Sequence, residues 1–285
     1  EILVDGFVDQ FWIEASRDLQ AVIVPFAGVP EPTYSLLRDY PAITLHNLHY
    51  NVVPTAETTM ALLLAAVKFV PSMDRELRNN DWSARYADTP VTTLHGKTAL
   101  VLGYGNIGRY LTPICKAFGM HVIGLRREAP EPGDAGETPV YPPGALHQLL
   151  PHTDILINVL PLTPETRGMI GEVEFDLLPD NAVLVNVGRG ETVDETALYR
   201  ALTKGRLLAA AIDVWYDYPR TVEERSTTPP SKYSFHDLDN VVMSPHRAGF
   251  LSSAEFKRMD DLADLLNHAA TGKAMPNLVN KDLGY

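Results

Sequence analysis

The feature that most constrains the fold is one continuous stretch, "TALVLGYGNIGRYLTPICKAFGMHVIGLRRE", at residues 98–128. It begins as an apolar strand, turns through closely spaced glycines, continues as a helix-like segment and closes on a second apolar strand. Strand, glycine turn, helix and strand in this order predict a βαβ unit, in which the two strands run parallel.

Apolar runs repeat this alternation along the rest of the chain. Helices are expected at about 55–69 and at 193–205, and further strands are expected at 154–160, 182–188, 207–213 and 240–245. Continuous apolar strands that alternate with helices are typical of a parallel sheet covered on both faces. The predicted fold class is therefore α/β, with Rossmann-like, doubly wound parallel sheets.

The length and the order of the segments predict two domains. A chain of 285 residues is longer than one compact core usually holds. A helix expected at 252–272 returns the chain to the first domain. We predict that residues 1–75 plus 250–285 form one domain, and that residues 76–249 form a second domain inserted into it.

The composition narrows the class of protein. Apolar residues make up 45% of the chain and charged residues 21%, which is ordinary for a globular protein. The net charge of −12 argues against nucleic acid or anionic membrane as a partner. The single cysteine, Cys115, excludes an internal disulfide and favours a reducing, cytoplasmic location. No His/Cys cluster has the spacing of metal ligands, so no metal site is predicted.

The glycine turn fits the pattern G-x-G-x-x-G through Gly103, Gly105 and Gly108, with Asn106 and Ile107 between them. The first glycine permits a tight turn, the second lets a pyrophosphate approach the backbone, and the third lets helix and strand pack closely. The pattern alone is weak, but its position between a strand and a helix is specific. It predicts a dinucleotide site, with a glycine turn that binds nothing as the alternative.

The end of the second strand suggests which dinucleotide binds. An NAD site usually carries Asp or Glu about 20 residues beyond the first glycine, to hold the ribose 2′-hydroxyl. Here Arg126 stands at that place, with Arg127 next to it. Two cations attract a 2′-phosphate, so the sequence favours NADP(H) over NAD(H). In the alternative, both arginines are solvated and Glu128 reaches the ribose.

Several segments together resemble the D-isomer-specific 2-hydroxyacid dehydrogenases. They are the glycine motif, "LPLTPETRGMI" (160–170), "LVNVGRGETVDETALYRAL" (184–202), "AAIDV" (210–214) and "NVVMSPHRAG" (240–249). The resemblance implies a cofactor domain inserted into a substrate-binding domain, an active site between them, and a homodimer. The chain begins in the strand-like "EILVDG" and, against that pattern, is expected to lack roughly the first strand–helix unit of the substrate domain.

The resemblance also implies roles for single residues. Arg189 matches the arginine that grips the substrate carboxylate, and His246 matches the general acid that protonates the carbonyl oxygen. Asp213 matches an aspartate near the nicotinamide carboxamide, and Gly188 lies on the cofactor side. The implied reaction is reduction of a 2-oxo acid to a D-2-hydroxy acid, or the reverse.

On the substrate side, the resemblance implies that Ala27 and Gly28 belong to a loop whose backbone amides help hold the carboxylate. His49, and His46 before it, lie in a second loop that is expected near the substrate. The alternative for this loop is a polar segment packed by its own side chains.

One position departs from the family pattern. Most members have Glu directly before the proline of this region, where it orients the catalytic histidine, but this chain has Tyr218 there. Tyr218 is expected to orient His246 through its hydroxyl, leaving the histidine with a lower pKa than a glutamate would give. Alternatively, Asp217 takes the place of the glutamate. In a third interpretation, the protein is a catalytically weak dinucleotide-binding or sensing protein. The sequence leaves open which 2-oxo acid is the substrate and which direction is physiological.

Overall fold

The computed structural model describes residues 1–128 and 137–285. The chain forms two compact units, one made of Glu1–Val52 and Phe250–Tyr285 and the other of Val53–Gly249. The return of the chain at Phe250 agrees with the predicted boundary, but the first boundary lies well before the predicted 75/76. The reason is helix α3 (Val52–Val67), whose apolar side chains pack in the core of the larger unit.

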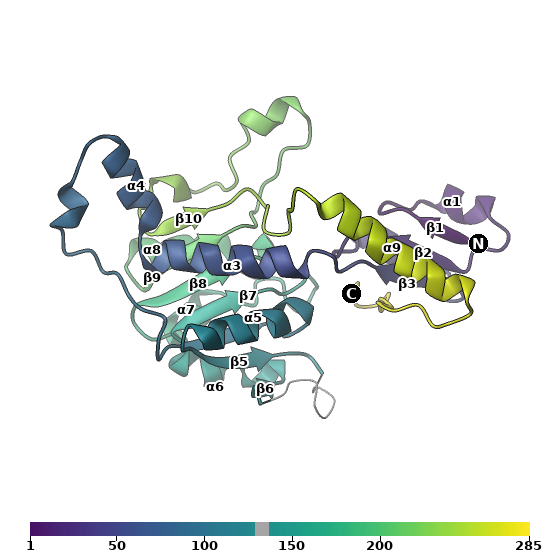
Figure 1. Cartoon of the computed structure of the whole chain (residues 1–285), viewed down its shortest axis with the longest axis horizontal. Coiled ribbons are helices and arrows are strands. Elements are labelled where there is room, and N and C mark those ends of the chain that lie inside the picture. The colour runs from purple at the N-terminus through teal and green to yellow at the C-terminus, as the bar shows by residue number, and fades with distance from the viewer. Residues whose placement is uncertain (129–136) are drawn as a thin grey trace. The chain divides into compact units, whose positions relative to one another are not determined.

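The larger unit is built on seven parallel strands in the order β10-β9-β8-β7-β4-β5-β6 (Figure 1). They are β4 (Thr98–Leu102), β5 (His121–Leu125), β6 (Val140–Tyr141), β7 (Ile155–Asn158), β8 (Ala182–Asn186), β9 (Leu207–Ile212) and β10 (Val241–Met243). The strand order reverses beside β4, since the chain runs outward to β5 and β6 and then crosses back to β7. This is the doubly wound topology that the sequence predicted.

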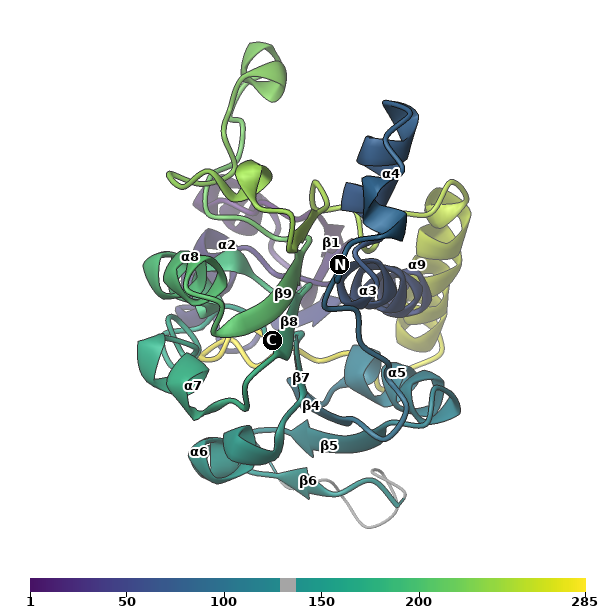
Figure 2. The ribbon, with the colours of Figure 1, turned by 90° about the vertical axis from the view of Figure 1, so that its left-hand side faces the viewer.

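Helices cover both faces of this sheet. Figure 2 shows α3 and α5 (Asn106–Ala117) on one side, with α6 (Leu146–Leu149), α7 (Glu172–Leu177) and α8 (Glu195–Thr203) on the other. The period of a strand divides its side chains between the two layers. In β4, Ala99 and Val101 join the core under α3 and α5, whereas Leu100 and Leu102 join the core under α7 and α8.

The smaller unit has a parallel three-stranded sheet in the order β1-β2-β3. Its elements are β1 (Ile2–Val4), α1 (Gln10–Ala15), β2 (Ala21–Val24), α2 (Glu31–Arg38), β3 (Thr44–Asn47) and α9 (Ala254–Ala270). Helices α1 and α2 pack on one face through Ile13 and Leu37, and α9 packs on the other through Leu265. The carboxyl ends of β2 and β3 therefore lie side by side.

Two segments project from the larger unit. Helix α4 (Val70–Arg78) follows Phe69, whose left-handed backbone (φ 53°) separates it from α3. The loop after β9 carries a 3-10 turn, η5 (Glu223–Ser226), and stands out in light green at the top of Figures 1 and 2. Among the described residues no single helix is long and apolar enough to cross a membrane. Helices α3 and α4 reach that length and apolarity only as a pair, bent by 66°.

Candidate active site

The glycine turn lies at the carboxyl end of β4, beside the reversal of strand order. Gly103 has a φ of +89°, and a Cβ there would stand 3.0 Å from the carbonyl oxygen of Val159, so the position requires glycine. At Gly108, a Cβ would stand 3.1 Å from Cγ1 of Val101, which confirms the predicted close packing of α5 on β4.

The space at Gly105 suits a phosphate. Among residues 1–128 and 137–285, a Cβ at this residue would meet no atom within 4 Å, and no side chain caps the helix that begins at Asn106. The first backbone amides of α5 are therefore available to an anion, and the helix dipole favours negative charge there. These residues fit the pyrophosphate of a dinucleotide.

The two arginines lie directly after β5, and both are half-buried. The backbone amide of Arg126 donates to Tyr141 in β6 (3.0 Å). Nη2 of Arg127 lies 3.5 Å from Oε2 of Glu165, a pairing that the sequence did not predict. A hydrogen bond with Thr163 is the main cause that lowers the pKa of Glu165, and the charge of Arg127 adds to it. Arg127 thus already has an anionic neighbour where a 2′-phosphate is predicted.

Arg189 lies between β8 and the turn η4 (Gly190–Thr192), with an extended backbone. Its Nη1 donates to the carbonyl oxygen of Gly188 (2.6 Å). A Cβ on Gly188 would stand 2.6 Å from the carbonyl oxygen of Leu160, so the chain passes too close for any side chain there. Burial lowers the pKa of the Arg189 guanidinium, but from a value so high that it stays charged. The site therefore presents a permanent, partly desolvated cation.

His246 lies in a tight turn after β10 that Asp213 holds in place. The backbone amide of His246 donates to the carbonyl oxygen of Asp213 (2.7 Å). The buried Asp213 carboxylate accepts hydrogen bonds from the amides of Arg247 (2.8 Å) and Ala248 (2.9 Å) and from the hydroxyl of Ser244 (2.5 Å). The turn leaves His246 with a left-handed φ of 55°, an uncommon conformation for a residue with a side chain.

The predicted role of Asp213 beside the nicotinamide thus stays a prediction, while the structure assigns its carboxylate a second task. Both carboxylate oxygens bind the turn that carries His246. Asp213 is fully buried at the end of β9, and its three bonds reach residues more than 30 positions away. The sequence pattern gave no sign of this contact.

Tyr218 contacts His246 by its ring and not by its hydroxyl. The ring centroids are 5.5 Å apart and the planes are inclined by 55°. The hydroxyl accepts a hydrogen bond from the backbone amide of Trp215 (2.9 Å). Burial raises the pKa of Tyr218, so it is neutral near pH 7. The structure therefore places Tyr218 beside the histidine, as predicted, but by packing instead of through the predicted hydroxyl contact.

The surroundings of His246 lower its pKa. Partial desolvation of the ring is the main cause, the positive charge of Arg189 adds to it, and Asp213 opposes both. In the part of the chain that the structure describes, no carboxylate forms an ion pair with the ring. Among the predicted catalytic residues, the structure therefore brings Arg189, Tyr218 and His246 together.

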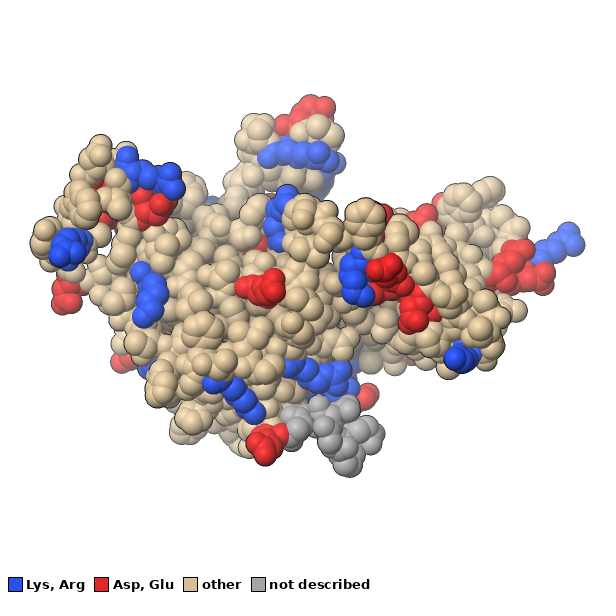
Figure 3. Space-filling view, in the orientation of Figure 1, with Lys and Arg blue, Asp and Glu red and all other residues tan. Residues whose placement is uncertain are grey.

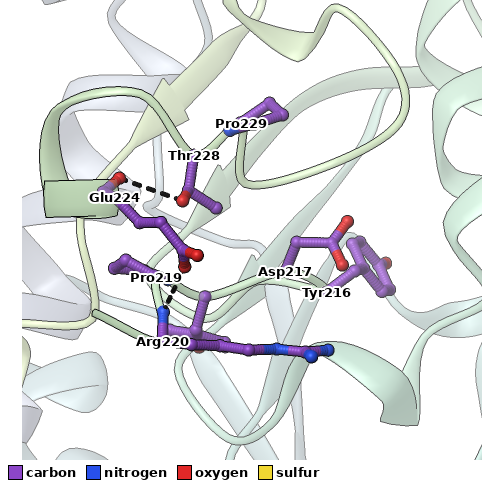
Figure 4. Close-up of a pocket in the computed structure, with 8 residues that line it drawn as sticks. Tyr216, Asp217, Pro219, Arg220, Glu224, Thr228 and Pro229 are labelled. Atoms are coloured by element: carbon purple, nitrogen blue, oxygen red, sulfur yellow. Dashed lines mark hydrogen bonds between the residues drawn. The ribbon is translucent and has the colours of Figure 1, made fainter.

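Asp217 is not part of that cluster. Its backbone amide donates to Pro230 (3.1 Å), and its exposed side chain faces a surface pocket that Figure 4 shows. Among the described residues, those that line this pocket all belong to the loop after β9; they are Tyr216, Asp217, Tyr218, Pro219, Arg220, Glu224, Thr228 and Pro229. Tyr218 borders both this pocket and the histidine.

In the smaller unit, the two predicted substrate loops lie together at the carboxyl edge of the sheet. Nδ2 of Asn47 donates to the carbonyl oxygen of Ala27 (2.6 Å), which ties the loop of Gly28 to the loop of His49. Burial lowers the pKa of His49, and Asp261 in α9 opposes this. His46 is buried, and its Nδ1 lies 2.8 Å from the carbonyl oxygen of Pro276.

The comparisons with known proteins agree with this geometry. The model of the "D-isomer specific 2-hydroxyacid dehydrogenase, NAD binding domain" matches residues 60–248. The chain belongs to this family. A glyoxylate reductase of Aeropyrum pernix is 38% identical over 234 residues, which are 80% of this chain and 67% of that protein. A D-3-phosphoglycerate dehydrogenase of Methanocaldococcus jannaschii is 33% identical over 268 residues, or 94% of this chain. The chain spans only 49% of that second relative.

Solved structures of this dehydrogenase family share the fold. The NADPH-dependent glyoxylate/hydroxypyruvate reductase of Sinorhizobium meliloti, solved with NADP and sulfate, has a TM-score of 0.81 and is 24% identical. The match covers 100% of this chain and 86% of that one. A D-lactate dehydrogenase of Aquifex aeolicus, solved with NAD and lactic acid, has a TM-score of 0.78 at 23% identity. The predicted family and α/β fold are confirmed.

Proposed function

We propose that this dehydrogenase reduces a 2-oxo acid to a D-2-hydroxy acid, or catalyses the reverse reaction, by hydride transfer with a nicotinamide dinucleotide. One observation carries the proposal. Arg189 and His246 extend from strands of the same sheet as the glycine turn, and they lie close enough for the charge of Arg189 to lower the pKa of His246. The glyoxylate reductases among its relatives support a small 2-oxo acid as the substrate.

Each residue then has a defined task. The first amides of α5 and the open backbone at Gly105 would hold the pyrophosphate. When it is bound, the reduced dinucleotide supplies the hydride. The planar fork of Arg189 binds the substrate carboxylate through two parallel hydrogen bonds. The His246 ring holds the proton for the carbonyl oxygen, and it removes that proton in the oxidation direction.

We further propose NADP(H) as the preferred cofactor. Arg126 and Arg127 follow β5 where an NAD site usually has an acidic residue. A 2′-phosphate carries more charge than the exposed carboxylate of Glu165 and would compete with it for Arg127. We also propose a homodimer, which the family resemblance supports. The single buried cysteine, Cys115, supports a cytoplasmic location.

The test is an initial-rate screen of NADPH and NADH oxidation with glyoxylate, hydroxypyruvate, pyruvate and phenylpyruvate between pH 5 and 9. We expect turnover with at least one acid, and a large rise in KM for that acid in Arg189→Lys. Lys keeps the positive charge but loses the planar fork, so this variant tests the geometry of the guanidinium separately from its charge.

A second candidate function is a catalytically weak dinucleotide-binding or sensing protein. The observation that favours it is the packing of Tyr218 against His246, at the position where most of the family has a glutamate. Tight cofactor binding without turnover on any of the four acids would support this function and overturn the reductase.

A further inference from the structure

Three buried polar side chains surround the segment that carries Arg189. Asn158 ends β7, Asn186 ends β8 and Thr192 closes the turn η4. Their exposed fractions are 0%, 1% and 0%, respectively. Polar groups at this depth are costly unless they are hydrogen-bonded, so their partners indicate what they do.

Asn158 is the centre of the cluster. Its Nδ2 donates to Oδ1 of Asn186 (3.0 Å) and to Oγ1 of Thr192 (2.6 Å). Its Oδ1 accepts from the amide of Leu160 (3.2 Å). Both donors and the acceptor of this one amide are therefore used, and they join two strands and a turn.

Both partners of Asn158 bind the backbone of Arg189. Its carbonyl oxygen accepts from Oγ1 of Thr192 (2.6 Å) and from Nδ2 of Asn186 (3.3 Å). Oδ1 of Asn186 also accepts from the amide of Gly188 (3.2 Å). Asn186 and Thr192 thus hold the backbone on either side of the Arg189 side chain, and Asn158 joins these two residues to each other.

The packing leaves this segment little freedom. A Cβ on Gly188 would stand 2.6 Å from the carbonyl oxygen of Leu160, and one on Gly190 would stand 2.2 Å from that of Trp215. The segment therefore passes between two other backbones, with Arg189 at its centre. The hydrogen bonds fix where along this passage the arginine lies.

We propose that Asn158, Asn186 and Thr192 form a positioning network that fixes Arg189 for the substrate carboxylate. The inference rests on the proposed function. The three side chains act through the backbone of Arg189 and do not themselves touch the substrate. Two parallel hydrogen bonds from a guanidinium to a carboxylate need defined geometry, so a small shift of the backbone weakens binding.

The test uses oxamate, an unreactive 2-oxo acid analogue, and the whole chain loaded with NADPH. The dissociation constant is measured from the fluorescence of the reduced nicotinamide. Thr192→Val keeps the shape of the side chain and removes its hydroxyl. We expect the constant for oxamate to rise about three- to tenfold, the effect of one lost hydrogen bond, with NADPH binding unchanged. Thr192→Ser restores the hydroxyl and is expected to lie within about twofold of the parent.

A second background separates positioning from simple stabilisation. In Arg189→Lys, Thr192→Val is expected to change oxamate binding less than about twofold, because residues that act through one group are not additive. If Thr192→Val weakens oxamate binding equally in both backgrounds, or in neither, the network only stabilises the fold. If Arg189→Lys alone leaves oxamate binding intact, the proposed function itself is wrong. Should Thr192→Val fail to fold, Thr192→Ala and Asn158→Leu give the same comparison.

Discussion

At the scale of single residues, the proposed reaction depends on how His246 works without a carboxylate partner among the described residues. Tyr218 is neutral, and its ring lies against His246 while its hydroxyl binds Trp215. The ring packs against the imidazole and supplies no charge. Arg189 then lowers the pKa of His246 further. Reduction requires the protonated histidine, so the reductase is expected to lose rate as pH rises through a comparatively low pKa.

Tyr218→Glu is therefore expected to raise the pKa of His246, because a nearby negative charge favours the protonated ring. The alkaline fall of kcat/KM in the reductase direction should move to higher pH. The measurement is kcat/KM between pH 5 and 9. Tyr218→Phe keeps the ring and adds no charge, so its midpoint is expected to stay near that of the parent. A glutamate variant with an unchanged profile would mean that position 218 does not govern the histidine.

The two arginines after β5 give a second prediction at this scale. Replacing both, with Arg126→Asp and Arg127→Ala, should weaken NADPH far more than NADH. Each lost charged hydrogen bond is expected to cost about 1.5–3 kcal/mol. The measurement is KM for both cofactors.

A matched control for this pair is Glu165→Gln, which removes the carboxylate beside Arg127 and is expected to keep or improve the use of NADPH. Equal losses for the two cofactors in the double variant would contradict the assignment of the arginines.

At the scale of elements, the inner strands β4, β7, β8 and β9 could be predicted because each is a continuous apolar run that is buried almost throughout. The two-residue edge strand β6 was not predicted. Helix α3 was predicted at about 55–69 from the helix-start signal at its N-terminus, but its apolar side chains did not reveal which unit they join. The short helices α1, α2, α4 and α7 were not predicted as separate elements. Their six to nine residues form about two turns, in which a 3.6-residue period is hard to recognise. Helix α8 is equally short, but Lys204 and Gly205 mark its end in the sequence.

The features of the candidate site also divide into those that the sequence indicated and those that it did not. Arg189, His246 and the glycine turn lie inside local motifs, so the sequence indicated them. The bonds of Asp213 to the His246 turn and the pairing of Arg127 with Glu165 join residues far apart in the chain. No local pattern encodes such contacts. The loop after β9 shows a further limit, since Asp217 and Tyr218 are neighbours in sequence and line the same pocket, but Tyr218 also packs against His246 and Asp217 does not form part of that cluster.

The turn that Asp213 holds gives a prediction for stability. Asp213→Asn keeps the shape but replaces one acceptor oxygen by a donor, which leaves a buried backbone amide without its partner. We expect the free energy of unfolding to fall by about 1.5–3 kcal/mol, measured by urea denaturation at pH 7. Asp217→Asn, on the exposed side of the same loop, should change it by less than about 0.5 kcal/mol. Similar losses in both variants would contradict the role of the Asp213 carboxylate.

At the scale of the whole molecule, acidic and basic side chains are interspersed over the face in Figure 3, so the net charge of −12 forms no single acidic patch there.

Apolar side chains are exposed along α4 and around the turn η1 (Ser83–Arg85) that follows it. Leu77 is 48% exposed, Trp82 61% and Tyr86 81%. Large exposed apolar side chains in one segment are typical of a protein interface.

The proposed homodimer is therefore expected to depend on this segment. Light scattering should give twice the mass of one chain, and Trp82→Ser combined with Tyr86→Ser should shift the protein toward the monomer. Phe11→Ser, on exposed α1 of the other unit, is the matched control and should leave the mass unchanged. A parent protein with the mass of one chain would contradict the dimer.

The bonds of Asp213 have a consequence for how this enzyme can diverge. Asp213 begins the loop after β9, and the turn of His246 follows the strand that ends it. Because hydrogen bonds join these two places directly, the backbone of the histidine does not depend on the length of chain between them. Lengthening a surface loop costs little entropy. Insertions between residues 219 and 237 can therefore accumulate, and the lining of the surface pocket in this loop can change, while His246 keeps its place.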